Sequence, residues 1–366
     1  MTSRTIPDLL FIGPLPPPVH GQAAATKDIL DMLVSRGLRV EAIDTGEGRM
    51  SGAARSRRAS IQLRAIRTVL RSPAPHLYLS VNANRGMALT VLLCLAGRIS
   101  GKTLTLHHHA YHYIAEHHSI MSLLGKTAGP QALHLAPCLG IGADLRDRYS
   151  SVRHILGYSN VGVVDNVLRP SARADEQPVR LGHMSNLTKA KGIGTTIAAF
   201  RAIRSAGQEV TLVVAGPCSD SFASEAIASA EREFGEAFTY LGPVYGEAKQ
   251  RFFDSFDIFV FPSEMETQGI VNLEAMSCGK PVVATGHCCI PRDIGRDGGL
   301  AVDPMADFAQ ALLGYIGDYL QDPAGASARA RLRYEALLAE HEGECEALVA
   351  GFRGDGAMNT DGRGAG

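Results

Sequence analysis

The chain alternates short apolar runs, each bounded by turn residues, with longer segments of helical period. This alternation is typical of parallel β-α-β units, so we predict an α/β fold. In the first half the predicted strands are 9–12, 39–43, 77–80, 103–106, 133–136 and 161–164, and the predicted helices are 22–35, 59–70 and 87–99.

The same pattern starts again after a polar stretch. Residues 169–178 (RPSARADEQP) have no apolar period and are typical of a linker. The second set of predicted strands is 179–182, 211–216, 239–241, 258–261 and 281–284. Because 366 residues exceed what one hydrophobic core usually organises, we predict two doubly wound, Rossmann-like domains, 1–168 and 179–352, facing each other across a cleft.

Helical segments are predicted at 308–320 and 326–349, and the last of them is a candidate to pack back on the N-terminal domain. Residues 353–366 are polar and rich in glycine, so we predict a disordered tail there.

The overall composition limits the partners of the chain. Lys and Arg total 36 against 37 Asp and Glu, which argues against a generally basic, nucleic-acid-binding surface. The longest strongly apolar run, 87–96, is much shorter than the ~20 residues that span a bilayer, and the N-terminus lacks a signal-peptide pattern. These features predict a cytoplasmic protein.

One strand-loop-helix segment has the features of a ligand site. The loop 262–269 follows a predicted strand and precedes a helix. Ligands of open α/β sheets bind beyond the carboxyl ends of the strands. The backbone amides of Gly269, Ile270 and Val271 open the helix, so we predict an anion site there that suits a diphosphate.

Two glutamates flank this predicted anion site. A carboxylate beside a phosphate would repel it, so Glu266 and Glu274 make sense if they accept hydrogen bonds from sugar hydroxyls. Glu274, about one turn into the helix, is assigned to a ribose, and Glu266 to a transferred sugar. The alternative is an ordinary surface glutamate and a first-turn glutamate favoured by the helix dipole.

Residues 266–285 (ETQGIVNLEAMSCGKPVVAT) resemble the motif of two glutamates separated by seven residues in the retaining glycosyltransferase family 4. Residues 13–21 (GPLPPPVHG) resemble the N-terminal loop of that family, and 189–193 (KAKGI) its Lys-Gly element. The resemblance covers most of the chain.

The resemblance implies a GT-B fold and transfer of a hexose-type sugar, with retention, from a nucleoside diphosphate sugar to an acceptor hydroxyl. It further implies that no metal or other cofactor is required. We expect a saccharide or lipid-linked acceptor, in cell-surface polysaccharide or glycolipid synthesis. Two alternatives stay open: a nucleotide-sugar epimerase of the same fold, and a catalytically silent nucleotide-sugar-binding protein.

The resemblance also assigns residues outside the motif. Lys191 is expected to neutralise the leaving diphosphate in place of a metal ion. Asn186 stands where the family often has an arginine, and Lys189 is a candidate to compensate. Gly21 is expected to let the N-terminal loop approach the donor, whereas His20 replaces the first of the two glycines usual in the family.

A histidine cluster, HHHAYH at 107–112, follows the predicted strand 103–106. In the family a histidine after this strand lines the cleft, and His109 or His107 could fill that role; we favour His109. The alternatives are a solvated polar loop, a general base, and a metal site, in which His108, His112 and Glu116 would lie on successive turns of one helix.

Six arginines cluster on a predicted amphipathic helix: Arg55, Arg57, Arg58, Arg64, Arg67 and Arg71. Two interpretations fit this pattern. The helix either holds the protein against an anionic membrane surface, at the inner face of the membrane, or covers a sheet with its arginines in solvent.

Overall fold

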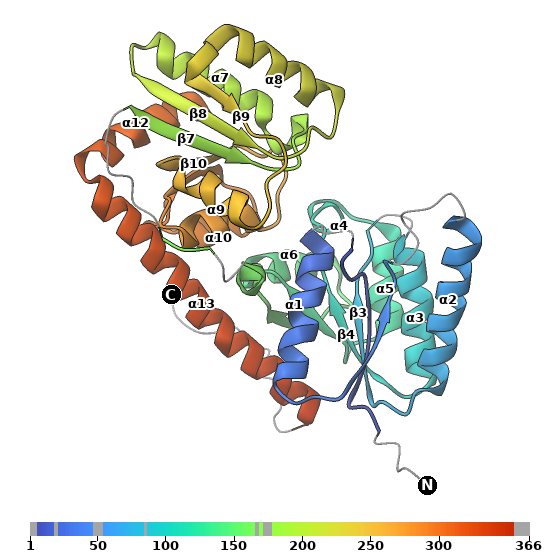
Figure 1. Ribbon diagram of the computed structural model, residues 1–366. Coiled ribbons are helices and arrows are strands. Elements are labelled where there is room, and N and C mark those ends of the chain that lie inside the picture. The colour runs from blue at the N-terminus through green and yellow to red at the C-terminus, as the bar shows by residue number, and fades with distance from the viewer. Residues whose placement is uncertain are drawn as a thin grey trace. The chain divides into compact units, whose positions relative to one another are not determined.

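The computed structural model describes residues 6–17, 21–46, 54–83, 86–164, 168–170 and 178–354, without the side chains of 54–59. The chain forms two compact units. One comprises the described residues up to Val163 and those from Glu340 onward, and the other runs from Val164 to Ala339. Each contains a six-stranded parallel sheet with helices packed against it (Figure 1). The prediction of two Rossmann-like α/β domains is confirmed.

The first unit has the strand order β2-β1-β3-β4-β5-β6. Its strands are β1 Leu9–Gly13, β2 Val40–Asp44, β3 His76–Ser80, β4 Thr103–His107, β5 Leu133–Ala136 and β6 His154–Gly157. Its helices are α1 Gly21–Ser35, α2 Ala54–Arg71, α3 Met87–Ile99, α4 His112–Ala115, α5 Ser119–Ala128 and α6 Leu139–Arg148.

The sixth strand of this sheet is not where the sequence predicted it. The predicted strand 161–164 is wrong, because Asn160–Val163 forms a 3-10 turn. Val161 is fully buried although it lies outside the sheet, so its apolar character reflects packing and not strand pairing. The sixth strand is β6, which pairs with β5.

The second unit has the strand order β12-β11-β10-β7-β8-β9. Its strands are β7 Val179–Met184, β8 Val210–Ala215, β9 Phe238–Tyr240, β10 Ile258–Phe261, β11 Val282–Thr285 and β12 Gly299–Val302. Its helices are α7 Ile193–Ser205, α8 Ser221–Phe234, α9 Glu247–Asp254, α10 Ile270–Ser277, α11 Ile290–Ile294, α12 Phe308–Gln321 and the start of α13 Pro323–Arg353. Sequence reasoning missed β12, since this half-exposed edge strand begins with a glycine and lacks a strong apolar run.

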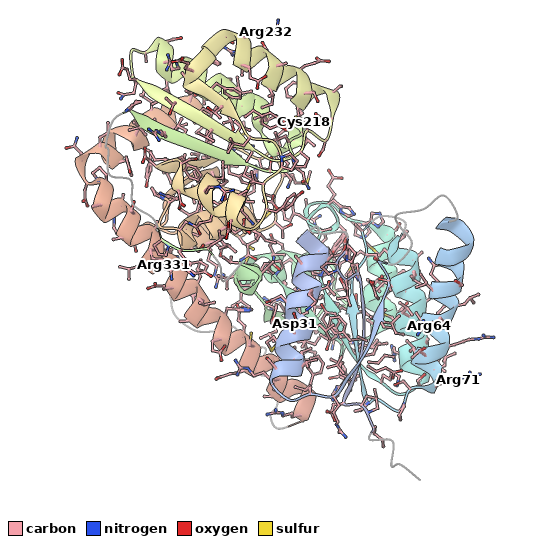
Figure 2. All side chains as sticks on the ribbon, in the orientation of Figure 1. Asp31, Arg64, Arg71, Cys218, Arg232 and Arg331 are labelled. Carbon is pink, nitrogen blue, oxygen red and sulfur yellow. The ribbon has the colours of Figure 1, made fainter. Side chains whose placement is uncertain are left out.

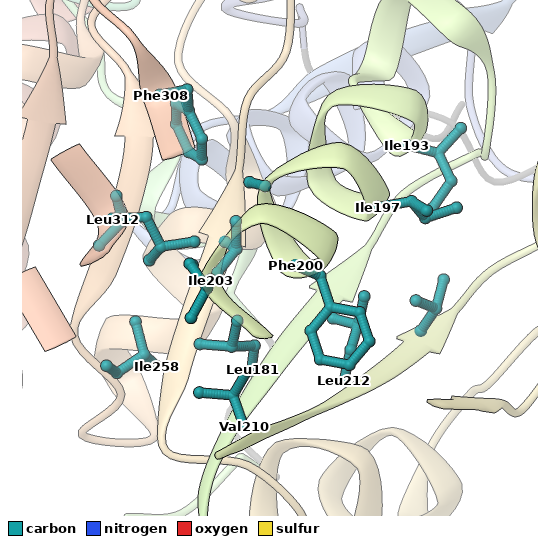
Figure 3. Close-up of a cluster of buried hydrophobic side chains, with 14 of the residues drawn as sticks. Leu181, Ile193, Ile197, Phe200, Ile203, Val210, Leu212, Ile258, Phe308 and Leu312 are labelled. Carbon is teal, nitrogen blue, oxygen red and sulfur yellow. The ribbon is translucent and has the colours of Figure 1, made fainter. Parts of the chain in front are cut away.

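The core of the second unit lies between its sheet and the helices α7 and α12. Phe200 and Ile203 of α7 pack with Leu181 of β7 and Leu212 of β8 (Figure 3). Burial of such side chains contributes ~25 cal/mol per Å² of apolar surface, which makes this sheet a rigid support for the loops at its carboxyl edge.

Helix α13 contributes to both units. Its residues before Glu340 belong to the second unit and the later ones to the first. Cys345, Leu348, Val349 and Phe352 belong to the same core cluster as β1, β3 and α1. None of the helices that the structure describes is sufficiently long and apolar to span a membrane. Most of the predicted linker and of the predicted tail lies outside the described residues.

Candidate functional site

The second sheet reverses its strand order between β7 and β10. From β7 the chain adds β8 and β9 on one side, then returns to place β10 on the other. The loops that follow β7 and β10 therefore leave the carboxyl edge on opposite sides, and open α/β sheets bind ligands at such a point. The loop after β7 carries Lys191, and the loop after β10 carries Glu266.

Lys191 is held in place by the turn that contains it. Residues Lys189–Lys191 form one 3-10 turn, and the Thr188 hydroxyl caps it by accepting a hydrogen bond from the Lys191 backbone amide, 3.2 Å. Gly192 follows with φ +82°, a conformation that favours glycine, and α7 starts directly after it.

Lys191 and Glu266 form an ion pair. The Lys191 ammonium Nζ donates a hydrogen bond to Glu266 Oε2, 2.6 Å. The other carboxylate oxygen, Oε1, accepts a hydrogen bond from the backbone amide of Thr267, 3.1 Å. The lysine side chain is 34% exposed and the glutamate 18%, so both groups are partly accessible to a ligand.

The loop that carries Glu266 is fastened to the segment after β11. The Cys289 amide donates to the Thr267 carbonyl, 3.1 Å, and the Gln268 side chain hydrogen bonds to Asp293. Burial raises the pKa of Asp293 to about 6, and Arg292 opposes this rise. These bonds restrict the loop immediately before α10.

Helix α10 begins at an open, uncapped end. Gly269 has φ +69° and provides no side-chain cap. The amides of Ile270 and Val271, in the first turn, have no intrahelical acceptor because of their position. The helix end, the partial positive charge of its dipole and the nearby Lys191 ammonium together favour an anionic group.

Glu274 lies deeper in the same helix and is buried, with 5% of its surface exposed. Its Oε1 accepts a hydrogen bond from the ammonium of Lys249, a residue of α9. Sequence reasoning missed Lys249. Lys249 lies 25 positions before Glu274, on another helix. The one feature of the sequence that could have singled it out is a positive charge near the start of a helix.

Asn186 and Lys189 are both exposed and lie in the loop after β7. The Lys189 backbone amide donates to Asp220 Oδ2, 3.2 Å. Among the described residues, neither the Asn186 nor the Lys189 side chain forms a hydrogen bond or ion pair with Glu266 or Glu274. Their predicted contact with a donor stays a prediction.

The first unit also brings polar residues to the carboxyl edge of its sheet. Gly21 starts α1, and the Gln22 amide of that helix donates to Ser80 Oγ, 3.0 Å. Ser80 ends β3, and its hydroxyl lies 3.1 Å from His109 Nε2. The strand order reverses between β1 and β3, so this small network lies at the switch point of the first sheet. His20 lies outside the described residues.

Two other histidines of the cluster, His107 and His108, are fully buried. His107 is fully buried, and its Nδ1 lies 2.7 Å from the Tyr78 hydroxyl. His108 is buried between Tyr113 and His134, at 3.1 Å and 2.9 Å. Burial holds the pKa of both His107 and His108 well below the usual value, so both rings are neutral. Of the two predicted candidates, His109 is the one with exposed surface.

The alternative metal site is wrong. It needs one unbroken helix from His108 to Glu116, but α4 contains only His112–Ala115 and His108 lies before it. No group of three or more His, Cys, Asp or Glu side chains in the described part of the chain is arranged to hold a metal ion.

Residues 178–318 match the family model for glycosyl transferases group 1. The chain is 29% identical to the sulfoquinovosyl transferase SQD2 of Arabidopsis thaliana over 49% of its own length and 35% of the relative. It is 30% identical to the amylovoran biosynthesis glycosyltransferase AmsK of Erwinia amylovora, over 45% and 42% of the two chains. The matched part thus spans only about two fifths of these relatives.

Among solved structures, HepE of Anabaena in complex with UDP-glucose has a similar fold, with a TM-score of 0.66. The match covers 93% of this chain and 99% of that chain, at 15% identity. The GT-B architecture expected from the sequence is confirmed, and so is the resemblance to glycosyltransferases, which the family match places in the segment that contains Lys191, Glu266 and Glu274.

Proposed function

We propose that the chain is a retaining glycosyltransferase, which transfers a sugar from a nucleoside diphosphate sugar to an acceptor hydroxyl. The observation that carries this proposal is the Lys191–Glu266 ion pair beside the open start of α10, within the segment that matches the glycosyltransferase family. This arrangement brings together a cation and helix-start amides, which suit phosphates, and a carboxylate, which suits hydroxyl groups. A nucleoside diphosphate sugar carries both kinds of group.

The donor binds with its diphosphate at the start of α10. The amides of Ile270 and Val271 and the Lys191 ammonium hold its negative charge, and Gly269 allows the close approach. Glu274 accepts hydrogen bonds from the ribose, while Glu266 aligns the transferred sugar. Asn186, Lys189 and Gly21 complete our assignment of donor-binding residues. HepE binds UDP-glucose, which supports a nucleotide-sugar donor here.

Transfer takes place on one face of the sugar. The departing phosphate oxygen accepts the proton of the acceptor hydroxyl, so the new bond forms on the side from which the diphosphate leaves. Lys191 and the helix amides stabilise the charge that develops on the diphosphate, which is why we propose that no metal is required. Among the histidines we assign a role in the site to His109, and not to the buried His107.

The acceptor is proposed to belong to cell-surface polysaccharide or glycolipid synthesis. AmsK is named for amylovoran biosynthesis and SQD2 for transfer of sulfoquinovose, which supports this class of product. We propose a cytoplasmic protein with a saccharide or lipid-linked acceptor.

We also propose that α2 binds an anionic membrane surface. Figure 2 shows the side chains of Arg64 and Arg71 on this helix. Among the described residues, Arg64, Arg67 and Arg71 form no ion pair, and they border a hollow of about 580 Å³. Leu63 and Leu70, on the same helix, are 61% and 49% exposed. Exposed leucines between unpaired arginines suit the boundary between lipid headgroups and acyl chains.

The test is incubation of the protein with a panel of nucleotide sugars in excess chelator, with and without a saccharide acceptor. We expect release of the nucleoside diphosphate and, with an acceptor, a product of unchanged anomeric configuration. Formation of an isomeric nucleotide sugar would favour an epimerase, and binding without turnover a silent binding protein. Activity that requires Mg²⁺ or Mn²⁺ would contradict metal independence.

A further inference from the structure

Asn272 is a buried polar residue at the start of α10. Only 1% of its surface is exposed. Among the residues that the structure describes, neither Oδ1 nor Nδ2 of its side chain has a hydrogen-bond partner. A buried amide without partners destabilises a fold, and most buried polar groups are paired. The unpaired amide therefore lowers the stability of the ligand-free chain, and an apolar side chain at this position would not.

The position of this amide connects it with Glu266. A Cβ placed on Gly269 would lie 2.7 Å from Asn272 Nδ2 and 3.4 Å from Glu266 Cγ. Both side chains thus lie against the same face of Gly269, at the open end of the helix. The Asn272 amide thus lies beside the glycine that joins the Glu266 loop to α10.

Donor binding changes the partners of Glu266. In the ligand-free chain its Oε2 accepts a hydrogen bond from Lys191. If the function proposed above is correct, the Lys191 ammonium turns toward the diphosphate when the donor binds. Glu266 Oε2 then loses its hydrogen bond with Lys191 at the stage when Glu266 aligns the sugar. A partly buried carboxylate then needs another donor, and the Asn272 amide is an unpaired donor beside the same glycine.

We propose that Asn272 is a positioning residue for Glu266 in the donor-bound state. Its Nδ2 group donates a hydrogen bond to the carboxylate and holds it against the sugar while Lys191 neutralises the leaving group. The inference rests on the proposed function and assigns a role to a residue that the glutamate spacing does not include.

The test compares Asn272→Leu in two backgrounds. Leucine keeps the branch at Cγ, favours a helix and removes the unpaired amide, although its side chain is larger than that of asparagine, so we expect a melting temperature at or above that of the parent. We nevertheless expect kcat to fall about 10-fold, with the donor KM changed less than about 3-fold. In a Glu266→Gln background, the same substitution should lower kcat less than about 2-fold, because the group that Asn272 positions is already altered.

Ser277→Ala is the matched control in the same helix. Ser277 is buried and its hydroxyl donates to the Glu274 carbonyl, 2.7 Å, so its loss lowers stability and leaves kcat unchanged. Unchanged kcat in Asn272→Leu, or an equal loss in both backgrounds, overturns the inference alone. Absence of turnover by the parent chain with every nucleotide sugar overturns the proposed function, and the inference with it.

Discussion

The backbone of Gly192 lies against the carbonyl oxygen of Pro262, so that a Cβ on Gly192 would come within 2.1 Å of that oxygen. Gly192 follows Lys191, and Pro262 is the first residue after β10. The contact brings together the two loops that carry Lys191 and Glu266. No side chain larger than that of glycine fits between them.

Gly192→Ala is therefore expected to destabilise the protein by about 2–4 kcal/mol and to reduce transfer, because both backbone strain and the close approach oppose the methyl group. Gly207→Ala is the control, since Gly207 has a similar φ of +87° but no atom within 4 Å of its Cβ position. It should cost only about 1 kcal/mol. Urea unfolding of both variants measures the difference, and equal losses would show that the loop contact is unimportant.

Substitutions of the two glutamates are expected to change different kinetic constants. Glu274→Ala removes a ribose contact made throughout the reaction and should mainly raise the donor KM. Glu266→Gln retains the shape of the side chain but removes its charge where positive charge develops on the sugar, so kcat should fall ~100-fold or more. Steady-state kinetics distinguishes the two. Near-normal kcat in Glu266→Gln, or an unaltered donor KM in Glu274→Ala, would mean that we have assigned these carboxylates wrongly.

Lys249 is expected to hold the buried Glu274 carboxylate in the orientation that accepts the ribose hydroxyls. Lys249→Met removes this hydrogen bond and leaves a buried carboxylate without its cation, so the donor KM should rise about 10-fold. Lys249→Arg keeps a cationic donor and should stay close to the parent. Steady-state kinetics measures both variants, and an equal rise of the donor KM in the two would point to lost packing instead.

The stability of the first unit is expected to fall in mild alkali because of His341 on α13. Its Nδ1 lies 3.0 Å from Glu344 Oε2. Burial opposes the charge, but hydrogen bonds with Cys345 and Glu344 raise the pKa of His341 to about 9. Asp28 and Tyr158 face the same ring. Because the pKa of His341 is higher in the folded than in the unfolded protein, its charge stabilises the fold. This stabilisation is fully present below the unfolded pKa of about 6.5 and is lost as the pH rises through about 9.

Urea unfolding from pH 6.5 to 9.5 measures this effect. The parent should lose ~2 kcal/mol more over this range than His341→Gln. The exposed His117 provides the control, because His117→Gln should follow the parent. If the parent and His341→Gln respond alike to pH, the histidine is not charged in the folded protein.

Neutralising the exposed arginines of α2 is expected to weaken vesicle binding. Each contributes ~1 kcal/mol near an anionic surface, so Arg64→Gln, Arg67→Gln and Arg71→Gln together should lower affinity ~100-fold. The control changes Lys126, Arg146 and Arg153 to Gln, which removes the same charge from other exposed positions of this unit. Sedimentation with anionic vesicles measures the binding of each variant. It is repeated at several salt concentrations, because salt screens such charges. Equal binding of the parent to neutral vesicles would contradict the proposal.

The sequence predicted best what depends on neighbouring residues. The spacing of Glu266 and Glu274 placed one in a loop and the other in a helix, and the structure has both there. Lys191 likewise lies between a strand and a helix, as its local pattern indicated. These features follow from the order strand, loop, helix, which a single sequence displays directly.

Features that depend on the folded chain could not be predicted. The pairing of Lys249 with Glu274 joins two helices, and nothing in the sequence near Lys249 specifies its partner. His107 and His109 could not be distinguished by strand alternation, because residues two apart in a strand point to the same face. The apolar run around Val161 predicted a strand, but a buried 3-10 turn needs the same apolar residues, so the sequence could not distinguish the two.

The passage of α13 into the first unit affects the order in which the chain can fold during synthesis. A ribosome makes β1 and α1 more than 300 residues before Leu348, Val349 and Phe352, which pack in the same core. The second unit, whose residues are contiguous, can complete its core before them. The first unit therefore keeps part of its apolar core exposed until residues 348–352 have been made, and the contiguous second unit can complete its packing before then.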